Sequence, residues 1–490
     1  MKSLLMTGAV LAAVPFLGAC SMQGKKEVKQ DKKPNVLFLF IDDITFNGAN
    51  ALGNPEIISP NIDKIVNSGV NFSNTYIMGG WNGAISIASR SQLITGKYIW
   101  NCHADEAKGF KSEIEPELTF PQVMHNAGYN TFESGKWHMK GVRPEPLFDK
   151  VDVPRIGGMP NQTPEGYNRP KSRQDTAWQP WDKTKGGFWE GGEHWSEKLA
   201  DVTINFINVN KGKEKPLFLY CAFNAAHDPR QSPKEFVDMY DVDQIKIPKN
   251  FLPEHPYMNE LGCGKNLRDA RLAPFPRTHY AVQKNRQEYY ALITHLDVQI
   301  GRVIKALKET GRLDNTIIVF AGDNGLSIGH HGLIGKQSMY DHSAKVPLVF
   351  SGVGVPKGQT RTQLTYMQDL VPTLYEMLGI EIPAQMQFHS DKAILENSSA
   401  EGRDAVYDSY VDLQRMVRDQ RYKLFFILKA KKAYLFDMKE DPEEMNDLFD
   451  KPEYKDEIKS LAKKYLALSK ESGDTLDIKP FFPEIFKDVE

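Results

Sequence analysis

The chain has 490 residues, of which 41% are hydrophobic and 25% are charged, and its formal net charge at pH 7 is -2. This is the composition of an ordinary globular protein, and the length suffices for two or three domains. The near-neutral charge gives no reason to expect a nucleic-acid partner, so we expect none.

The N-terminus carries an export pattern. Lys2 precedes an apolar run over residues 4–17, which is too short to span a membrane as a helix. The run ends in Leu-Gly-Ala-Cys20, which resembles a bacterial lipobox, whose cysteine is lipidated. We therefore predict a lipoprotein signal peptide over residues 1–20 and a flexible polar tether over residues 21–34. An ordinary signal peptide is the alternative.

The residues after Cys20 bear on the location of the protein. They read Ser-Met-Gln-Gly-Lys-Lys and lack the acidic run that resembles a surface-export signal in some lipoproteins. We predict an exported, membrane-anchored lipoprotein that faces the periplasm. The other cysteines are Cys102, Cys221 and Cys263, which allow at most one disulfide in an oxidising compartment.

Short apolar runs alternate with helical patterns along the chain. The runs are continuous, as is typical of strands buried on both faces of a parallel sheet. The clearest helical pattern covers residues 286–310 and stops at Gly311. This alternation predicts an α/β fold. The predicted strands cover residues 35–41, 129–132, 216–223, 316–320 and 347–350.

Polar segments follow four of these strands. Ligands bind at the carboxyl ends of the strands in open parallel sheets, so we expect the four segments to meet at one edge. Turn and cap chemistry could explain one such segment, but not four together. The segments are Asp42-Asp43, Ser134-Gly-Lys136-Trp-His138, Asn224-Ala-Ala-His227-Asp228 and Asp323-Asn324-Gly325.

Two regions differ from the alternating pattern. Residues 145–195 and 248–285 are rich in Pro and other irregular-structure formers, and we interpret them as insertions over the sheet edge that contact substrate. After about residue 385 the pattern becomes a strand hairpin and a charged helix. We predict a catalytic domain over residues 35–385 and a smaller C-terminal α+β subdomain over residues 386–490. The hairpin strands are residues 422–428 and 433–436, and the helix covers residues 455–470.

One segment carries a specific resemblance. Ser86-Ile-Ala-Ser-Arg90-Ser-Gln-Leu-Ile-Thr-Gly96 resembles the signature of type I sulfatases, whose first residue is oxidised to formylglycine by a maturase. This sequence has Ser86 rather than Cys, and Ala88 where Pro is commoner. Both features resemble the subset served by anaerobic-type maturases, which implies such a partner. The resemblance to the family covers nearly all of residues 35–450. Within the family, the sequence is similar to bacterial carbohydrate sulfatases.

The resemblance implies a fold and a nucleophile. The fold is alkaline-phosphatase-like, a mixed and mostly parallel sheet sandwiched by helices, with the smaller C-terminal subdomain. The nucleophile is formylglycine at position 86, because an unmodified serine hydroxyl is a poor nucleophile without a base. Ser86 would begin a helix, where free N–H groups favour an anion. Arg90 would lie on the same helical face and act in catalysis by steadying the hydrate and the sulfate.

A metal site is also predicted. Carboxylate and amide oxygens at two strand ends suit Ca²⁺ better than Zn²⁺. Helix capping and a turn are the alternative for either pair alone. The resemblance implies a ligand set of Asp42, Asp43, Asp323, Asn324 and the modified Ser86.

The resemblance assigns four basic residues to catalysis. His138 would deprotonate the hydroxyl of the sulfated adduct and so expel sulfate. His227 and Lys336 would hold the sulfate and protonate the leaving alcohol, and Lys136 would stabilise the formylglycine oxygens.

The substrate prediction is a sulfated carbohydrate. Polar residues suit a hydroxyl-rich sugar, which needs directed hydrogen bonds. We expect exo-acting removal of sulfate, with galactose or N-acetylgalactosamine sugars favoured. A phosphatase or phosphodiesterase of the same fold is one alternative, and a non-catalytic lipoprotein that binds sulfated glycans is another. The predicted substrate contacts are Asp228, Arg230, His194, His330 and His331.

Overall fold

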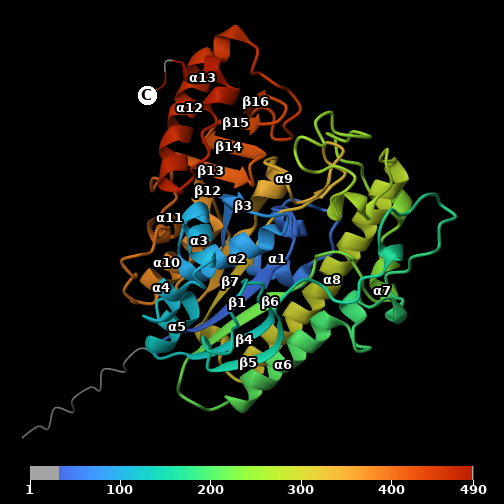
Figure 1. Cartoon of the computed structure of the whole chain (residues 1–490). Coiled ribbons are helices and arrows are strands. Elements are labelled where there is room, and N and C mark those ends of the chain that lie inside the picture. Colours follow the sequence, from blue (N-terminus) through green and yellow to red (C-terminus); the bar gives the residue numbers. More distant parts are fainter. Residues whose placement is uncertain (1–31, 488, 490) are drawn as a thin grey trace, which may run out of the picture. The chain divides into compact units, whose positions relative to one another are not determined.

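The computed structural model describes residues 32–487 and 489. Its centre is a nine-stranded sheet in the order β10-β2-β11-β7-β1-β6-β4-β5, with β12 paired to β2 (Figure 1). The strands are β1 (Asn35–Ile41), β2 (Gly69–Tyr76), β4 (Asn130–Lys136), β5 (Lys150–Arg155), β6 (Leu217–Phe223), β7 (Thr316–Gly322), β10 (Lys345–Val346), β11 (Leu348–Gly352) and β12 (Gln359–Tyr366).

The middle of this sheet is parallel. β1 pairs in parallel with both β6 and β7, and β4 pairs in parallel with β6. The predicted strand 347–350 corresponds to β11, which runs antiparallel to β7 and β2, so the sheet is mixed and mostly parallel, as the resemblance implied. A continuous apolar run reports burial on both faces but carries no information on direction. β4 extends beyond the predicted 129–132, and Lys136 is its last residue.

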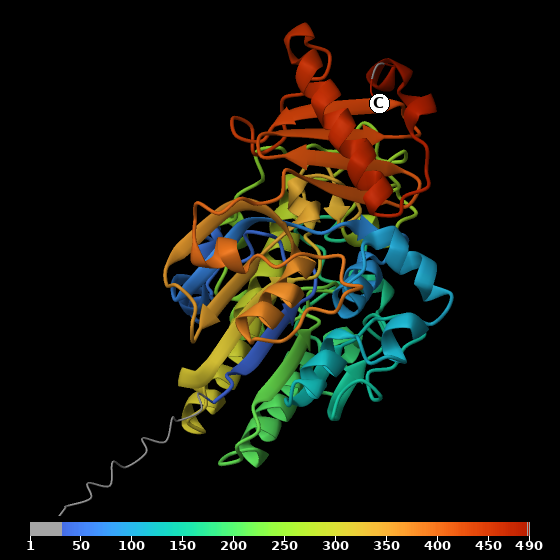
Figure 2. The ribbon, with the colours of Figure 1, turned by 90° about the vertical axis from the view of Figure 1, so that its left-hand side faces the viewer.

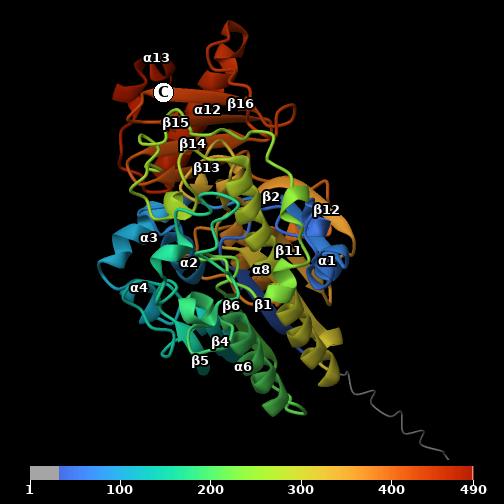
Figure 3. The same cartoon turned by 90° about the vertical axis from the view of Figure 1, so that its right-hand side faces the viewer.

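Helices cover both faces of the sheet. Alternate residues of β1 enter two different cores, because successive side chains of a strand point to opposite faces. Leu37 and Leu39 pack in one core with residues of α1, α6 and α8 (Figure 3), whereas Phe38 and Phe40 pack in the other with residues of α2, α5 and α10. This confirms the predicted sandwich. The helices are α1 (Pro60–Asn67), α2 (Ile85–Thr95), α5 (Phe120–Asn126), α6 (Trp195–Val209), α8 (His279–Glu309) and α10 (Leu370–Met377).

α8 begins earlier than the predicted residue 286. The Thr278 side chain accepts a hydrogen bond from the N–H of Ala281 and so caps the helix at its observed start. The predicted insertion 145–195 contains β5 at the sheet edge as well as irregular turns. The shorter helices are α3 (Ile99–Glu106), α4 (Lys111–Ile114), α7 (Lys234–Val237), α9 (Asp341–Ala344), α11 (Lys392–Glu396) and α13 (Pro483–Phe486).

A second sheet lies in the C-terminal part of the chain, and α12 (Lys455–Glu471) packs across it (Figure 2). The predicted hairpin and helix are present as β15, β16 and α12. The predicted boundary at residue 385 falls between α10 and α11. The order of the sheet is β16 (Lys432–Asp437), β15 (Tyr422–Ile427), β14 (Gln414–Asp419), β13 (Ala405–Tyr410) and β3 (Gly79–Gly80).

β3 comes from a distant part of the sequence. It pairs in parallel with Ser409 and Tyr410 of β13, and α2 begins five residues after β3 ends. Gly79 has a φ of 85°, and a Cβ atom there would lie 2.0 Å from the carbonyl oxygen of Ser409. A glycine is therefore required for this close approach of two backbones.

The predicted signal peptide over residues 1–20, the lipidated Cys20 and nearly all of the predicted tether over residues 21–34 lie outside the described residues. Cys102, Cys221 and Cys263 are each buried and free. In the described part of the chain, no helix combines the length and the apolar character needed to cross a membrane.

Candidate active site

Ser86 lies at the centre of the polar cluster predicted at the sheet edge. It is buried in the first turn of α2, and its Oγ atom is 3.2 Å from an acceptor oxygen of Asp42 and 3.2 Å from an acceptor oxygen of Asn324. The Nζ atom of Lys136 lies 3.2 Å from the same Oγ atom. The ends of β1, β4 and β7 therefore meet at the N-terminus of α2, as the sequence predicted.

Three buried carboxylates lie beside Ser86. Oxygen atoms of Asp42, Asp43 and Asp323 are all within 4.8 Å of one another, so this group could hold a metal ion. The amide of Asn324 donates to Asp43 over 2.8 Å. Asp43 has a φ of 54°, a strained conformation for a non-glycine residue, of the kind that is frequent at functional sites. The all-oxygen donor set fits a hard cation such as Ca²⁺.

Each carboxylate also pairs with one cation. Lys136 donates to Asp42 over 2.5 Å, Lys336 donates to Asp43 over 2.6 Å, and Arg90 donates to Asp323 over 2.9 Å. Burial alone would raise the pKa of Asp42, but Lys136 and its other cationic neighbours outweigh that effect and hold the pKa well below its usual range. Three charges of each sign cancel, so a divalent cation would make the site positive and attractive to an anionic ester.

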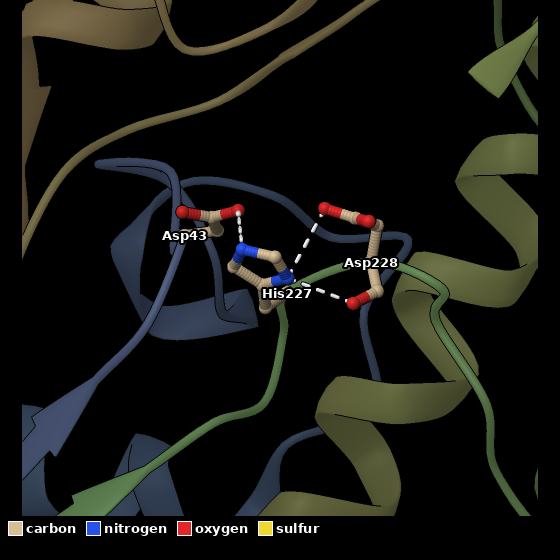
Figure 4. Close-up of side chains that lie close together, drawn as sticks. All are labelled: Asp43, His227 and Asp228. Atoms are coloured by element: carbon tan, nitrogen blue, oxygen red, sulfur yellow. Dashed lines mark hydrogen bonds and ion pairs between the residues drawn. The ribbon is translucent and has the colours of Figure 1, made fainter. Parts of the chain in front are cut away.

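His227 lies between two carboxylates (Figure 4). Its Nε2 atom is 3.8 Å from Asp43, and its Nδ1 atom is 2.7 Å from the carbonyl oxygen of Asp228 and 3.1 Å from the carboxylate of Asp228. Because both neighbours of Nδ1 are acceptors, Nδ1 carries a hydrogen, which leaves Nε2 facing the cluster. Burial would raise the pKa of Asp228, but His227 and Arg268 outweigh it and lower that pKa.

His138 and Lys336 have opposite electrostatic surroundings. Burial, reinforced by Lys136, lowers the pKa of His138 to about 2, so its ring is neutral. Burial would lower the pKa of Lys336, but Asp43 more than offsets it and raises the pKa, so the ammonium group stays charged. His138 also has a φ of 58°.

Two of the predicted substrate contacts lie next to this cluster. Asp228 contacts His227 directly. Arg230 is buried with a φ of 54°, and it donates to Asn285 while its Nε atom and its second terminal nitrogen have no hydrogen-bond partner among the described residues.

The other three predicted contacts, all histidines, form hydrogen bonds or ring stacks within the protein. His194 is buried at the start of α6, where its Nδ1 atom accepts from Ser196 and its Nε2 atom pairs with the carbonyl of Gln231. His330 stacks on His342 with ring centres 5.2 Å apart. In the described part of the chain, no hydrogen bond or ion pair joins either histidine to the cluster around Ser86. The structure therefore does not bring either histidine to the cluster, and their role as substrate contacts stays a prediction.

His331 is placed in the same way. Its Nε2 atom pairs with Asn250 and with the carbonyl of Glu443, and its ring stacks on Tyr340 with centres 4.0 Å apart. These contacts tie residues 329–332 to the C-terminal part of the chain. The structure thus places His331 in packing contacts away from Ser86, and its role as a substrate contact stays a prediction.

Sequence reasoning missed the residues that surround Asp228. Tyr167 donates to its carboxylate over 2.7 Å, Arg268 donates over 2.9 Å, and Gln162 donates over 3.3 Å. All three lie in the two predicted insertions. Their composition indicated that these insertions contact substrate, but it gave no means to select individual residues.

The chain matches known proteins over most of its length. A family model described as sulfatase matches residues 34–380, and one described as N-sulphoglucosamine sulphohydrolase, C-terminal, matches residues 329–471. An N-acetylglucosamine-6-O-sulfatase of Bacteroides thetaiotaomicron is 27% identical, with 94% of this chain and 90% of that protein covered. An arylsulfatase of Clostridium perfringens is 26% identical, with 88% and 93% covered.

Solved structures show the same fold. A structure described as a complex with D-glucosamine-2-N,6-O-disulfate has a TM-score of 0.69 at 24% identity and covers 91% of this chain and 100% of that one. A phosphonate monoester hydrolase of Agrobacterium radiobacter has a TM-score of 0.68 at 19% identity, with 90% and 96% covered. The predicted alkaline-phosphatase-like architecture is confirmed. With the family match over residues 34–380, the chain belongs to the sulfatase family and is a sulfuric ester hydrolase.

Proposed function

We propose that this protein removes O-sulfate from the end of a sulfated glycan, with Ser86 converted to formylglycine. The position of Ser86 carries the proposal, because its Oγ atom contacts Asp42, Asn324 and Lys136 at the point where three strands end. Relatives named as N-acetylglucosamine-6-O-sulfatase and ulvan-active sulfatase support a glycan substrate.

The chain's own residues would bind and polarise the ester. Asp42, Asp43, Asp323 and Asn324 would hold Ca²⁺, which supplies positive charge to the sulfate and to the oxygen at position 86. Formylglycine, as its hydrate, supplies a nucleophilic hydroxyl and a second hydroxyl for sulfate release.

The basic residues would move protons and hold charge. His138, which is neutral because burial lowers its pKa, accepts a proton from position 86. Lys336 stays charged and holds the sulfate, while His227, oriented by Asp228, protonates the leaving alcohol. Lys136 stabilises oxygen at position 86 from 3.2 Å.

The sequence and the names of the relatives bear on which sugar carries the sulfate ester. The sequence favoured galactose or N-acetylgalactosamine, whereas the names of the relatives from Bacteroides thetaiotaomicron and human point to N-acetylglucosamine. The proposal therefore takes a sulfated hexose or N-acetylhexosamine as the substrate class. A panel of 2-, 3-, 4- and 6-sulfated sugars of both kinds would select among them.

A phosphatase or phosphodiesterase is the second candidate. Asp43, His227 and Asp228 form another group that could hold a metal ion, and a mixed nitrogen and oxygen donor set is typical of Zn²⁺. Matched phosphate and sulfate esters would distinguish the candidates. A large preference for the phosphate ester would contradict the sulfatase proposal, and glycan binding without turnover by formylglycine-bearing protein would favour a binding protein.

Processing and location belong to the same proposal. We propose an anaerobic-type maturase as the partner that modifies Ser86, lipidation at Cys20, and a periplasm-facing membrane anchor. Fractionation of cells that produce the wild type or Cys20→Ala would test the anchor. We expect the wild type in the membrane fraction and the variant in the soluble fraction. Equal partition of the two would contradict lipidation.

The first experiment is to weigh the tryptic peptide that contains Ser86. Protein produced together with an anaerobic maturase should show the loss of two hydrogen atoms at Ser86 and should hydrolyse a sulfated sugar. Ser86→Ala, produced in the same way, should do neither. An unmodified Ser86 beside a demonstrably active maturase would overturn the assignment of the nucleophile.

A further inference from the structure

A pocket of about 640 Å³ adjoins the candidate active site, and its volume falls in the range of small-molecule binding sites. Its walls come from the two insertions over the sheet edge rather than from the sheet itself. Its lining includes Gln162, Tyr167, Lys265, Arg268, Arg271 and Phe275.

Residues of the pocket wall contact a residue of the candidate active site directly. Arg268 and Tyr167 line it and donate to Asp228 over 2.9 Å and 2.7 Å. The same Asp228 lies 3.1 Å from the Nδ1 atom of His227. One wall of the pocket is therefore a single residue away from the histidine that we assign to the leaving alcohol, so a glycan bound at His227 would have this pocket beside it.

A second connection leads to the other sulfate-binding residue. Asp269 is the neighbour of Arg268 and accepts a hydrogen bond from Gln337 over 2.9 Å. The Gln337 side chain in turn accepts from the backbone N–H of Lys336 over 3.0 Å. The segment that carries Arg268 and Arg271 is thus fixed to the segment that carries Lys336, and the spacing between pocket and active site is set by the fold.

The residues that line the pocket include three cations and no carboxylate. Arg268 pairs with the two buried carboxylates of Asp228 and Asp269, which are not among the lining residues. Arg271 is exposed and forms no ion pair within the described residues. Lys265 lies 3.9 Å from Glu254, but both side chains are exposed at 63% and 41%, so water and salt screen this pair. Two cations in a concave site, without a buried carboxylate to neutralise them, favour an anionic ligand.

We propose that this pocket binds a second anionic group of the glycan, a sulfate or a carboxylate, on the sugar that carries the scissile ester or on its neighbour. Arg271 and Lys265 would contact that group, because their nitrogens are charged donors without a buried carboxylate partner. The preferred substrate would thus be a glycan with at least two anionic groups. This inference rests on the proposed function, since it presumes that the leaving sugar lies beside His227.

The kinetic test compares three substrates that share one scissile sulfate. The first is otherwise neutral, the second carries another sulfate, and the third carries a neighbouring uronate. We expect the wild type to prefer one of the doubly anionic substrates, and which of them wins identifies the second group. The preference should fall as salt is raised from 50 to 500 mM. Equal kcat/KM values on all three substrates would overturn the inference.

Variants test whether Arg271 and Lys265 cause the preference for a doubly anionic substrate. Arg271→Gln combined with Lys265→Gln should lower kcat/KM on the preferred doubly anionic substrate on the order of tenfold, mainly through KM, and should affect the neutral one much less. Both side chains are exposed, so the variant should fold. Arg143→Gln removes a 64% exposed arginine elsewhere and should match the wild type. Equal losses on all substrates would contradict the proposal.

A binding measurement separates the pocket from catalysis. Calorimetry with Ser86→Ala protein, which cannot carry formylglycine, should show binding of the doubly anionic glycan that weakens on the order of tenfold when Arg271 and Lys265 are also replaced. Binding that is independent of these two residues would overturn the pocket assignment. Failure of the formylglycine-bearing wild type to hydrolyse any sulfate ester would instead overturn the proposed function, and calorimetry would still report on the pocket.

Discussion

The Nζ atom of Lys136 lies 3.2 Å from the Oγ atom of Ser86, although the two residues come from the end of β4 and the start of α2. The same ammonium group donates to Asp42. One cation thus contacts both the nucleophile position and a proposed metal ligand. Its loss should therefore affect both the stability of the fold and the reactivity at position 86.

Replacement of Lys136 by Met should leave the carboxylate of Asp42 buried without its nearest cation. Removal of one partner from a buried ion pair costs about 3–5 kcal/mol, so we expect a loss of this size in the free energy of unfolding without metal. Urea denaturation would measure it. Lys140→Met removes a 67% exposed lysine and should change stability by less than about 1 kcal/mol. Equal effects of the two substitutions would contradict the pairing of Lys136 with Asp42.

Calcium should stabilise the wild type. Binding to the folded state alone adds about 2.7 kcal/mol when free Ca²⁺ is a hundredfold above its Kd, so Tm should rise with Ca²⁺ after treatment with a chelator. Asp43→Asn removes one carboxylate of the cluster and should abolish most of this rise. Asp314→Asn, at an exposed position, should keep it. A Tm that ignores Ca²⁺ in the wild type would exclude the proposed site.

His227 should matter more for poor leaving groups than for good ones. A sugar alcohol needs a proton as it leaves, whereas a nitrophenolate does not, and general acid catalysis contributes about 10²–10⁴-fold. His227→Gln should therefore lose far more activity on a sulfated sugar than on nitrophenyl sulfate. Comparison of kcat/KM on the two substrates measures this, with His279→Gln, at an exposed position, as the matched control. A uniform loss would indicate a role other than proton donation.

Stability should fall in mild acid because of buried histidines around Tyr340. Burial lowers the pKa of His255 to about 4, and burial with the neighbouring His255 lowers that of His331 to about 3. Both are neutral in the folded protein, while the unfolded chain takes up protons below about pH 6.5. Their contribution is therefore complete above that pH and is lost, on the order of 1 kcal/mol per pH unit and histidine, as pH falls toward 4.

Unfolding in urea between pH 7.5 and 4.5 would test this dependence. Glu444 acts in the opposite direction, because burial raises its pKa to about 7 and the folded state then binds the extra proton. A comparison of variants removes this background. His255→Gln should flatten the fall in stability with acid, whereas the exposed His279→Gln should not. Parallel curves for the wild type and His255→Gln would contradict the assignment.

The sequence predicted the residues whose positions follow from the sheet. Asp42, Lys136, His227 and Asp323 lie at or just beyond the ends of strands, and parallel strands must deliver such residues to one edge. The signature placed Ser86 at the start of a helix. These positions depend on local sequence patterns and on the rule that the carboxyl ends of parallel strands lie at one edge of the sheet. They could therefore be predicted from the sequence alone.

The remaining features depend on contacts between distant segments. The direction of β11 is set by its pairing with β7 and β2, which a buried apolar run does not reveal. His194 and His331 have the residue type of a substrate contact, but both ring nitrogens of His194 contact Ser196 and Gln231, and Nε2 of His331 contacts Asn250 and Glu443. Only tertiary structure shows that such a histidine is already engaged.

The pairing of β3 with β13 limits how the protein can be divided or recombined. A truncated chain that lacks β13 would leave Gly79 and Gly80 without their strand partner, immediately before the helix that carries Ser86. The C-terminal subdomain is therefore not a detachable module. A chimaera that takes this subdomain from a relative would keep an ordered nucleophile only if the incoming strand accommodates the close approach of Gly79.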